Sequence, residues 1–122
     1  MTRRIVLAAL LALALPFAAP AAAQSFDCAK AAAADEKAIC ADPALGNLDS
    51  RMATLWWVME QAPLMMGARG ALRDEQQAFL KARAACGAGT ACLTKAYEAR
   101  IAALEAAVKG QMQAYCKAIQ LC

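Results

Sequence analysis

The side chains that could do chemistry in this sequence are cysteines and carboxylates, because its 122 residues include no histidine. The absence of histidine excludes a Ser-His or Cys-His catalytic pair, a His-liganded zinc site and an imidazole pH switch. Asp35 and Glu36 are paired acids, as in glycoside hydrolases, but neighbouring residues of a helix do not face each other. Acids near the start of a helix usually interact with its dipole. We therefore expect no catalytic residue and no enzymatic activity.

The six cysteines are predicted to form three disulfides. An even number of cysteines in a small exported chain is typical of a disulfide framework. Of the possible pairings we favour Cys28–Cys40, Cys86–Cys92 and Cys116–Cys122, because each joins sequence neighbours across a segment that a turn can close. A metal cluster is the weaker interpretation, since no C-x-x-C spacing occurs and an oxidising compartment competes for the thiolates.

The methionines offer a second interpretation as metal ligands, because thioether sulfur suits Cu(I). The residues concerned are Met52, Met59, Met65, Met66 and Met112. Two of them fall on the apolar stripe of a predicted helix, which favours core packing. We predict no metal and no cofactor.

Residues 1–23 have the pattern of a signal peptide. Arg3 and Arg4 precede an apolar run over residues 5–15, Pro16 interrupts it, and Ala21 to Ala23 form a small-residue cleavage site. The apolar run is too short for a retained membrane span. Paired arginines also fit twin-arginine export, although general secretion is the simpler interpretation. We expect cleavage after Ala23 and a soluble periplasmic or extracellular protein without a lipid anchor, formed by a single domain over residues 24–122.

The charge of the processed chain disfavours a nucleic-acid partner. Removal of residues 1–23 reduces the basic residues from 13 to 11, against 10 acidic residues. A net charge near +1 does not provide the basic surface that binding to nucleic acid or anionic membranes needs. We expect a protein partner, and the sequence leaves the oligomeric state open.

The expected fold is all-α: a small disulfide-stapled bundle of about four helices with short connections. Roughly a quarter of the processed chain is alanine, the best helix former, and β-branched residues are few. A short helix is expected between Cys28 and Cys40. The next helix should begin at Asp42-Pro43, an N-cap followed by proline, and end at Pro63.

The second half of the chain should contain two further helices. We expect a loop over residues 63–70 and then a helix over 71–85, with Asp74 and Glu75 in its first turns. Residues 86–92 should form a turn closed by cysteines, with Thr90 capping a helix whose apolar stripe runs over residues 93–108. Gly110 is expected to break or bend this helix before a C-terminal segment.

Two blocks of residues carry a resemblance to a known family. Phe26 to Ala31, residues 36–45 and Leu48-Asp49 resemble the opening of the LprI-type lysozyme inhibitor domain. Residues 77–86, followed by Cys92-Leu93, Tyr97, Arg100-Ile101 and Leu104, are similar to the second cysteine block of that family. The resemblance covers residues 26–104 and leaves 105–122 as a C-terminal extension. The chain has Phe79 where the family usually has tryptophan, and Trp56 where it usually has tyrosine.

The resemblance implies an exported helical protein that inhibits lysozyme without catalysis, by binding the enzyme and occluding its cleft. The alternative is an envelope-associated helical module that binds another exported protein or a cell-wall component and does not inhibit lysozyme. The resemblance also places Asp49, Arg83 and Arg100 at family-pattern positions, where we expect a structural ion-pair network.

Several residues are candidates for contact with a protein partner. Trp56 and Trp57 cannot both face the core, because adjacent helical positions diverge by about 100°. An exposed Trp57 could anchor a partner, or lie at the edge of the core. The turn over 86–92 could be a pre-organised projection or only a tight helix connection. Asp49 could add to an acidic face that attracts a cationic lysozyme. The candidate partner-binding residues are therefore Asp35, Glu36, Asp42, Trp57, Gly87, Gly89 and Thr90.

Overall fold

The computed structural model describes residues 24–122, so the predicted signal peptide lies outside the described residues. The described chain forms one short 3-10 helix and four α-helices, with no strand in residues 24–122. The elements are η1 (Cys28–Lys30), α1 (Ala34–Ala41), α2 (Pro43–Gln61), α3 (Met66–Ala85) and α4 (Thr90–Ala118). The predicted all-α, disulfide-stapled bundle is confirmed.

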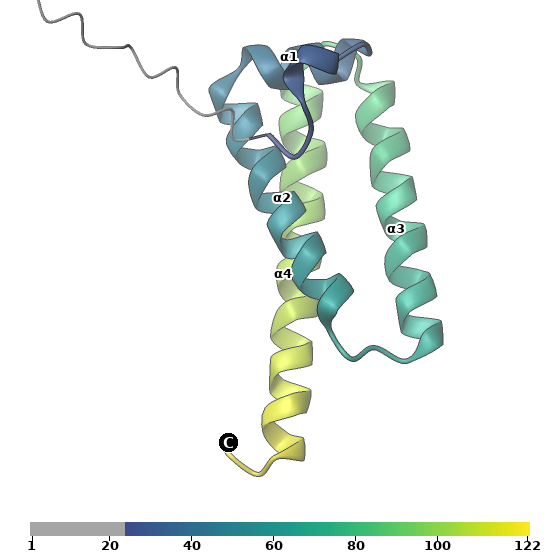
Figure 1. Ribbon diagram of the computed structural model, residues 1–122, viewed down its shortest axis with the longest axis vertical. Coiled ribbons are helices and arrows are strands. Elements are labelled where there is room, and N and C mark those ends of the chain that lie inside the picture. The colour runs from purple at the N-terminus through teal and green to yellow at the C-terminus, as the bar shows by residue number, and fades with distance from the viewer. Residues whose placement is uncertain (1–23) are drawn as a thin grey trace, which may run out of the picture.

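The helices α2 and α4 pack side by side, and α3 lies against α4 (Figure 1). The short α1 crosses one end of the bundle, where it contacts α2 and α3, and the α3–α4 turn lies at the same end (Figure 1). We call this end the α1 end. At the opposite end, which we call the C-terminal end, α4 continues past the ends of α2 and α3 (Figure 1).

The sequence predicts both ends of α2 correctly. The carboxylate of Asp42 accepts hydrogen bonds from the backbone N–H groups of Ala44 at 2.8 Å and Leu45 at 3.5 Å. Pro43 occupies the first helical position, where its missing N–H costs nothing. The helix ends at Gln61, shortly before Pro63.

The start of α3 differs from the prediction. The helix begins at Met66, so the connecting loop spans only residues 62–65 and the predicted loop over 63–70 is wrong. Asp74 and Glu75 consequently lie well inside the helix and not in its first turn. The physical reason is Arg69, whose guanidinium donates to the carbonyl oxygens of Glu60 and Ala62, both at 2.9 Å. The first turn of α3 is thereby fixed against the C-terminal carbonyls of α2.

Two predictions for α4 are also wrong, namely that Thr90 caps its start and that Gly110 breaks it. Gly89, not Thr90, is the N-cap residue, and no side chain caps the helix. Gly110 does not break the helix, which continues to Ala118. A single glycine in a helix costs only about 1 kcal/mol relative to alanine, and backbone hydrogen bonding on both sides of it maintains the helix.

The core is one cluster of ten buried side chains contributed by all four α-helices. Within it, the rings of Phe79 on α3 and Tyr97 on α4 meet edge to face, with centroids 5.2 Å apart. The last buried residue of α4 is Leu104. The core residues are Ile39, Leu45, Met52, Met59, Leu72, Phe79, Leu93, Tyr97, Ile101 and Leu104.

The three disulfides have the predicted pairing. The Cα atoms are 5.8 Å apart in Cys28–Cys40, and 5.5 Å apart in Cys86–Cys92 and in Cys116–Cys122. The first two lie at the α1 end, and the third closes the tip of α4.

The methionines divide between core and surface. Met52 and Met59 are buried in the core, as core packing requires, whereas Met65, Met66 and Met112 are exposed. Within residues 24–122, no group of three or more cysteine, aspartate or glutamate side chains is arranged to hold a metal ion. None of the helices over these residues combines the length and apolar character needed to cross a membrane.

Candidate functional site

At the α1 end, Asp35 and Arg83 form a buried ion pair between α1 and α3. The Nε atom of Arg83 lies 2.9 Å from Oδ2 of Asp35, and the two side chains are 13% and 3% exposed. The guanidinium also lies over the ring of Phe26, 5.7 Å from its centroid. Asp35 is therefore part of the framework and is not available to a partner.

Glu36 and Asp42 are occupied by backbone hydrogen bonds. The Glu36 carboxylate accepts from the N–H groups of Ala32 at 2.9 Å and Ala33 at 3.1 Å. These two bonds favour the charged form and hold the pKa of Glu36 below its ordinary value. Because Asp35 and Asp49 are buried, the predicted acidic face is wrong.

Asp49 is a fully buried carboxylate that joins three parts of the chain. Its Oδ1 accepts a hydrogen bond from the Tyr97 hydroxyl at 2.8 Å, and its Oδ2 accepts one from the Ser25 backbone N–H at 2.5 Å. Burial, followed by the hydrogen bond to Asp49, raises the pKa of Tyr97. The contact with Tyr97 holds α2 against α4, and the contact with Ser25 holds the N-terminal end of the described chain against α2.

Arg100 makes a separate polar contact between α4 and α3. Its Nε donates to Oε1 of Gln76 and its Nη1 to Oε2 of Glu75, both at 3.0 Å. The predicted network is confirmed only in part: Arg83 and Arg100 form ion pairs with Asp35 and Glu75, whereas Asp49 forms none among the described residues. Arg83 is close enough to Tyr97, the partner of Asp49, to oppose the rise in the pKa of that tyrosine. Asp49 and Arg100 are buried and Arg83 is half-buried, which is consistent with the predicted structural role.

The sequence pattern did not identify these partners. The helical spacing predicts Tyr97 only as a member of the apolar stripe. A buried tyrosine hydroxyl, however, usually needs a hydrogen-bond partner. Gln76 lies three residues before Phe79 on the same face of α3 and is buried, so its polar side chain within an apolar stripe was a signal.

The Cys86–Cys92 turn lies at the α1 end and is exposed in its middle (Figure 1). Gly87 has a φ of 53°, a left-handed conformation that favours glycine. The N–H of Gly89 donates to the carbonyl of Cys86 at 3.0 Å, and a Cβ atom at Gly89 would lie 3.1 Å from that oxygen. Ala88, Gly89 and Thr90 are exposed. The two glycines therefore shape a tight turn, and the disulfide closes it.

Trp57 is exposed and Trp56 is partly buried against the core, as the sequence predicts for adjacent tryptophans. Trp57 lies beside a shallow depression formed with Ser25, Ser50 and Thr54. It follows the first residue of α2 by 14 positions, which corresponds to about 21 Å along the helix axis. Trp57 and the turn are therefore on different parts of the molecule, and the sequence candidates do not form one site.

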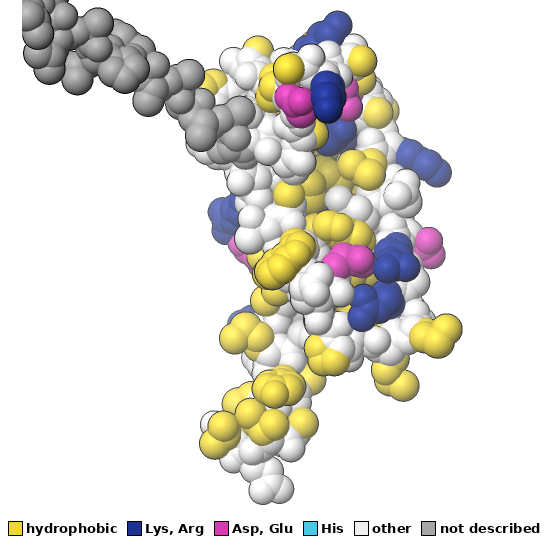
Figure 2. All heavy atoms as spheres, in the orientation of Figure 1, with side chains coloured by type: hydrophobic (Ala, Val, Ile, Leu, Met, Phe, Trp, Pro, Cys, Tyr) yellow, Lys and Arg dark blue, Asp and Glu magenta, His cyan; other side chains and the backbone are white. Residues whose placement is uncertain are grey.

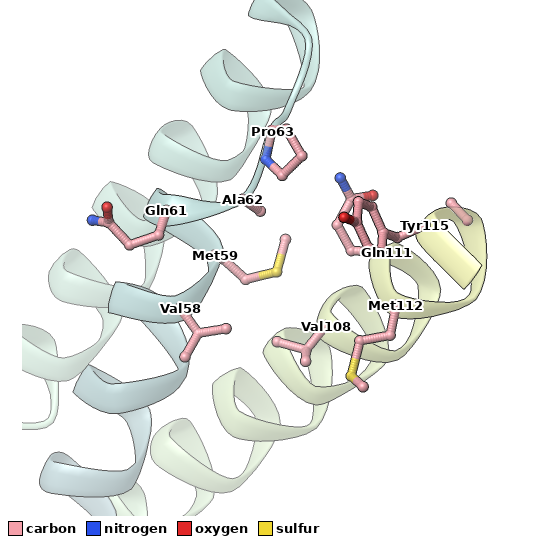
Figure 3. A pocket seen from close by; sticks show the side chains of 10 residues that line it. Val58, Met59, Gln61, Ala62, Pro63, Val108, Gln111, Met112 and Tyr115 are labelled. Atoms are coloured by element: carbon pink, nitrogen blue, oxygen red, sulfur yellow. The ribbon is translucent and has the colours of Figure 1, made fainter. Parts of the chain in front are cut away.

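The structure has an apolar groove at the C-terminal end that the sequence pattern does not predict. It has a volume of about 450 Å³ and lies between the end of α2 and the part of α4 beyond Leu104 (Figure 3). Its lining includes Val58, Pro63, Val108, Met112 and Tyr115.

Further hydrophobic side chains gather on the surface of this end (Figure 2). Met112 is 68% exposed and Tyr115 is 62% exposed, and Ile119 and Leu121 are exposed beyond them. The spacing of Met112, Tyr115 and Ile119 by three and four residues was the available signal. A helix break at Gly110 would separate these residues from the apolar stripe over 93–108, so the sequence does not predict a continuous apolar face.

These features define a small all-α domain with three disulfides, buried polar contacts between its helices, a rigid exposed turn and an open apolar groove. A comparison of the sequence with protein-family models finds no match, and comparisons with curated proteins and with solved structures find none either. The resemblance to the LprI-type domain consequently rests on the residues and spacings of the chain itself.

Proposed function

We propose that this chain is an exported, non-catalytic inhibitor that binds a lysozyme and occludes its cleft with the Cys86–Cys92 turn. The choice of partner rests on the resemblance of residues 26–104 to the LprI-type domain. The structural observation that supports the mode of binding is the exposed, disulfide-closed turn at the α1 end.

The turn suits insertion into a concave site for two physical reasons. Its exposed residues Ala88, Gly89 and Thr90 are small, so their backbone can approach a partner closely. The disulfide and the hydrogen bond from Gly89 to Cys86 restrict the turn before binding, which reduces the conformational entropy lost in the complex.

The framework behind the turn supports the same interpretation. Arg83, three residues before Cys86, is held by Asp35 on α1. Leu93, one residue after Cys92, is fully buried in the core. Both ends of the turn are therefore anchored, and the turn is held in a fixed orientation relative to the bundle.

The test measures peptidoglycan hydrolysis by several types of lysozyme during titration with the exported, oxidised protein. We expect dose-dependent inhibition. Ala88→Tyr adds bulk at the exposed turn and should weaken inhibition at least tenfold, about 1.4 kcal/mol of binding free energy. Ala102→Tyr is the matched control, because Ala102 is exposed on α4 away from the turn and should leave inhibition unchanged.

Two results would contradict the proposal. If no lysozyme is inhibited by a large molar excess of folded protein, the alternative of an envelope-associated module without lysozyme inhibition is favoured. If Ala88→Tyr and Ala102→Tyr inhibit equally well, occlusion by the turn is wrong.

A further inference from the structure

Asp49 is a buried carboxylate that forms no ion pair among residues 24–122. Its side chain is fully buried on α2, and it accepts hydrogen bonds from the Tyr97 hydroxyl and the Ser25 backbone N–H. None of the ion pairs formed within residues 24–122 includes Asp49. A buried carboxylate usually has a cationic partner, because hydrogen bonds from neutral groups replace only part of its lost hydration.

The N-terminal end of the described chain is held against this carboxylate. Ser25 contributes one of the two hydrogen bonds, and Phe26 packs against the core. Gln24 lies on Gly46 of α2, so closely that a Cβ atom at Gly46 would be 2.6 Å from Nε2 of Gln24. The glycine thus leaves the space that the Gln24 amide occupies.

Gln24 also carries an unused hydrogen-bond acceptor. Its Oε1 is buried and has no hydrogen-bond partner among the described residues. Buried polar atoms without partners are uncommon in folded proteins, and each indicates a missing donor. The unpaired acceptor of Gln24 and the carboxylate of Asp49 on α2 therefore both lie beside the N-terminal segment of the described chain.

The backbone nitrogen of Gln24 is close to both groups. Standard bond lengths and angles place consecutive backbone nitrogens at most about 4 Å apart. Since the Ser25 nitrogen is 2.5 Å from Oδ2 of Asp49, the Gln24 nitrogen lies within about 6 Å of the same oxygen. Rotation about the backbone dihedrals of residue 24 changes this distance, and a hydrogen bond requires about 2.9 Å.

We infer that Asp49 binds the α-ammonium group that cleavage after Ala23 creates on Gln24, with Oε1 of Gln24 accepting a second hydrogen from it. The inference rests on the proposed export and on cleavage after Ala23. Cleavage converts a neutral amide nitrogen with one N–H into a cation with three N–H donors. In the uncleaved chain the Gln24 nitrogen is a neutral amide, so processing adds an ion pair at the junction of α2, α4 and the N-terminal segment.

The first test compares two exported proteins that differ only in where the new N-terminus lies. Insertion of Gly-Ser between Ala23 and Gln24 keeps residues 1–23 intact but moves the α-ammonium two residues away from Asp49. Intact mass must first show that the unmodified chain begins at uncyclised Gln24. We expect the inserted variant to unfold at a urea concentration lower by roughly 1 M, as followed by tryptophan fluorescence.

Asp49→Asn separates loss of the ion pair from a general effect of the insertion. Asparagine retains an oxygen that can accept a hydrogen bond but carries no charge. In the Asp49→Asn background, the Gly-Ser insertion should change the urea midpoint little. If the insertion lowers the midpoint equally with aspartate and with asparagine at position 49, the inference is wrong.

The reactivity of the α-amino group provides a second measurement that does not depend on stability. Bound to Asp49, the group should react with an acylating reagent at neutral pH about tenfold more slowly than in the Asp49→Asn protein. Equal rates, or a chain lighter by one ammonia because Gln24 has cyclised, would overturn the inference. An N-terminus elsewhere than Gln24 would instead contradict the proposed cleavage, and the mass alone identifies that outcome.

Discussion

Replacement of Arg83 by methionine should test whether the buried ion pair fixes α1 to the bundle. Methionine keeps the unbranched apolar part of the side chain but leaves the Asp35 carboxylate, 3% exposed, without its cation. Breaking a buried pair from one side costs about 3–5 kcal/mol, because the remaining charge is still desolvated. Arg83 is 13% exposed, and solvent can replace part of the lost contact, so we expect about 3 kcal/mol.

The assay is equilibrium unfolding in urea followed by tryptophan fluorescence, which reports on Trp56 packed against the core as well as on the exposed Trp57. For a domain of this size the slope is roughly 1.5 kcal/mol per M, so Arg83→Met should lower the midpoint by about 2 M. Arg73→Met is the matched control: Arg73 lies 3.4 Å from Glu60 on the surface and is 58% exposed, so its loss should cost under about 1 kcal/mol.

The double variant Asp35→Asn with Arg83→Met tests whether the unpaired Asp35 carboxylate causes the loss of stability. Removal of both charges leaves no unpaired buried carboxylate, so the double variant should be more stable than Arg83→Met alone. The reasoning is refuted if Arg83→Met and Arg73→Met cost the same, or if neutralising Asp35 gives no recovery.

Three further predictions each concern the hydrogen bonds of one side chain. Tyr97→Phe removes the hydrogen bond to Asp49 and should cost about 1.5–3 kcal/mol. Because burial and Asp49 raise the pKa of Tyr97 above its ordinary 10.0, the wild-type protein should lose stability as the pH rises above that value. Alkaline unfolding curves with the same pH dependence for Tyr97→Phe would contradict this assignment. The backbone hydrogen bonds of Glu36 lower its pKa, so its ionised carboxylate stabilises the fold at pH values above the ordinary pKa of 4.5. This stabilisation is lost as the pH falls below that value and the carboxylate is protonated. Thermal melts of Glu36→Gln at acid pH should therefore depend less on pH than those of the wild type, and identical slopes would disprove the cap. Arg69→Ala removes two hydrogen bonds to the end of α2 and should lower the free energy of unfolding in urea by about 1–3 kcal/mol. An unchanged urea midpoint would show that Arg69 does not fix the start of α3.

Local signals in the sequence were sufficient wherever neighbouring residues decide the structure. Asp42 followed by Pro43 determines the start of α2 through backbone groups only two and three residues away. The paired tryptophans were interpreted correctly because the helical period alone separates Trp56 from Trp57. The disulfides joined cysteines that are neighbours in sequence, so their pairing required no knowledge of how the helices pack.

The errors occurred where distant residues decide the outcome. Residues 66–70 are helical because Arg69 reaches carbonyl groups on the preceding helix, which no local propensity reveals. The partners of Asp49 and Arg83 lie 48 residues away in each case. The charges of Asp49 and Arg83 predict that both residues form polar contacts. Only the arrangement of the helices determines which side chains are their partners.

The projection of α4 beyond the core implies that stability is graded along a single helix. Val108 is the last residue of α4 that packs against the core, so residues 109–118 continue the helix beyond it, and a free helix of this length is marginal in water. Amide hydrogens near Met112 should therefore exchange with solvent through local fraying, whereas those near Tyr97 should exchange only when the bundle opens. The tip of α4 can thus unwind and re-form while the domain stays folded, and substitutions there can accumulate with little effect on global unfolding.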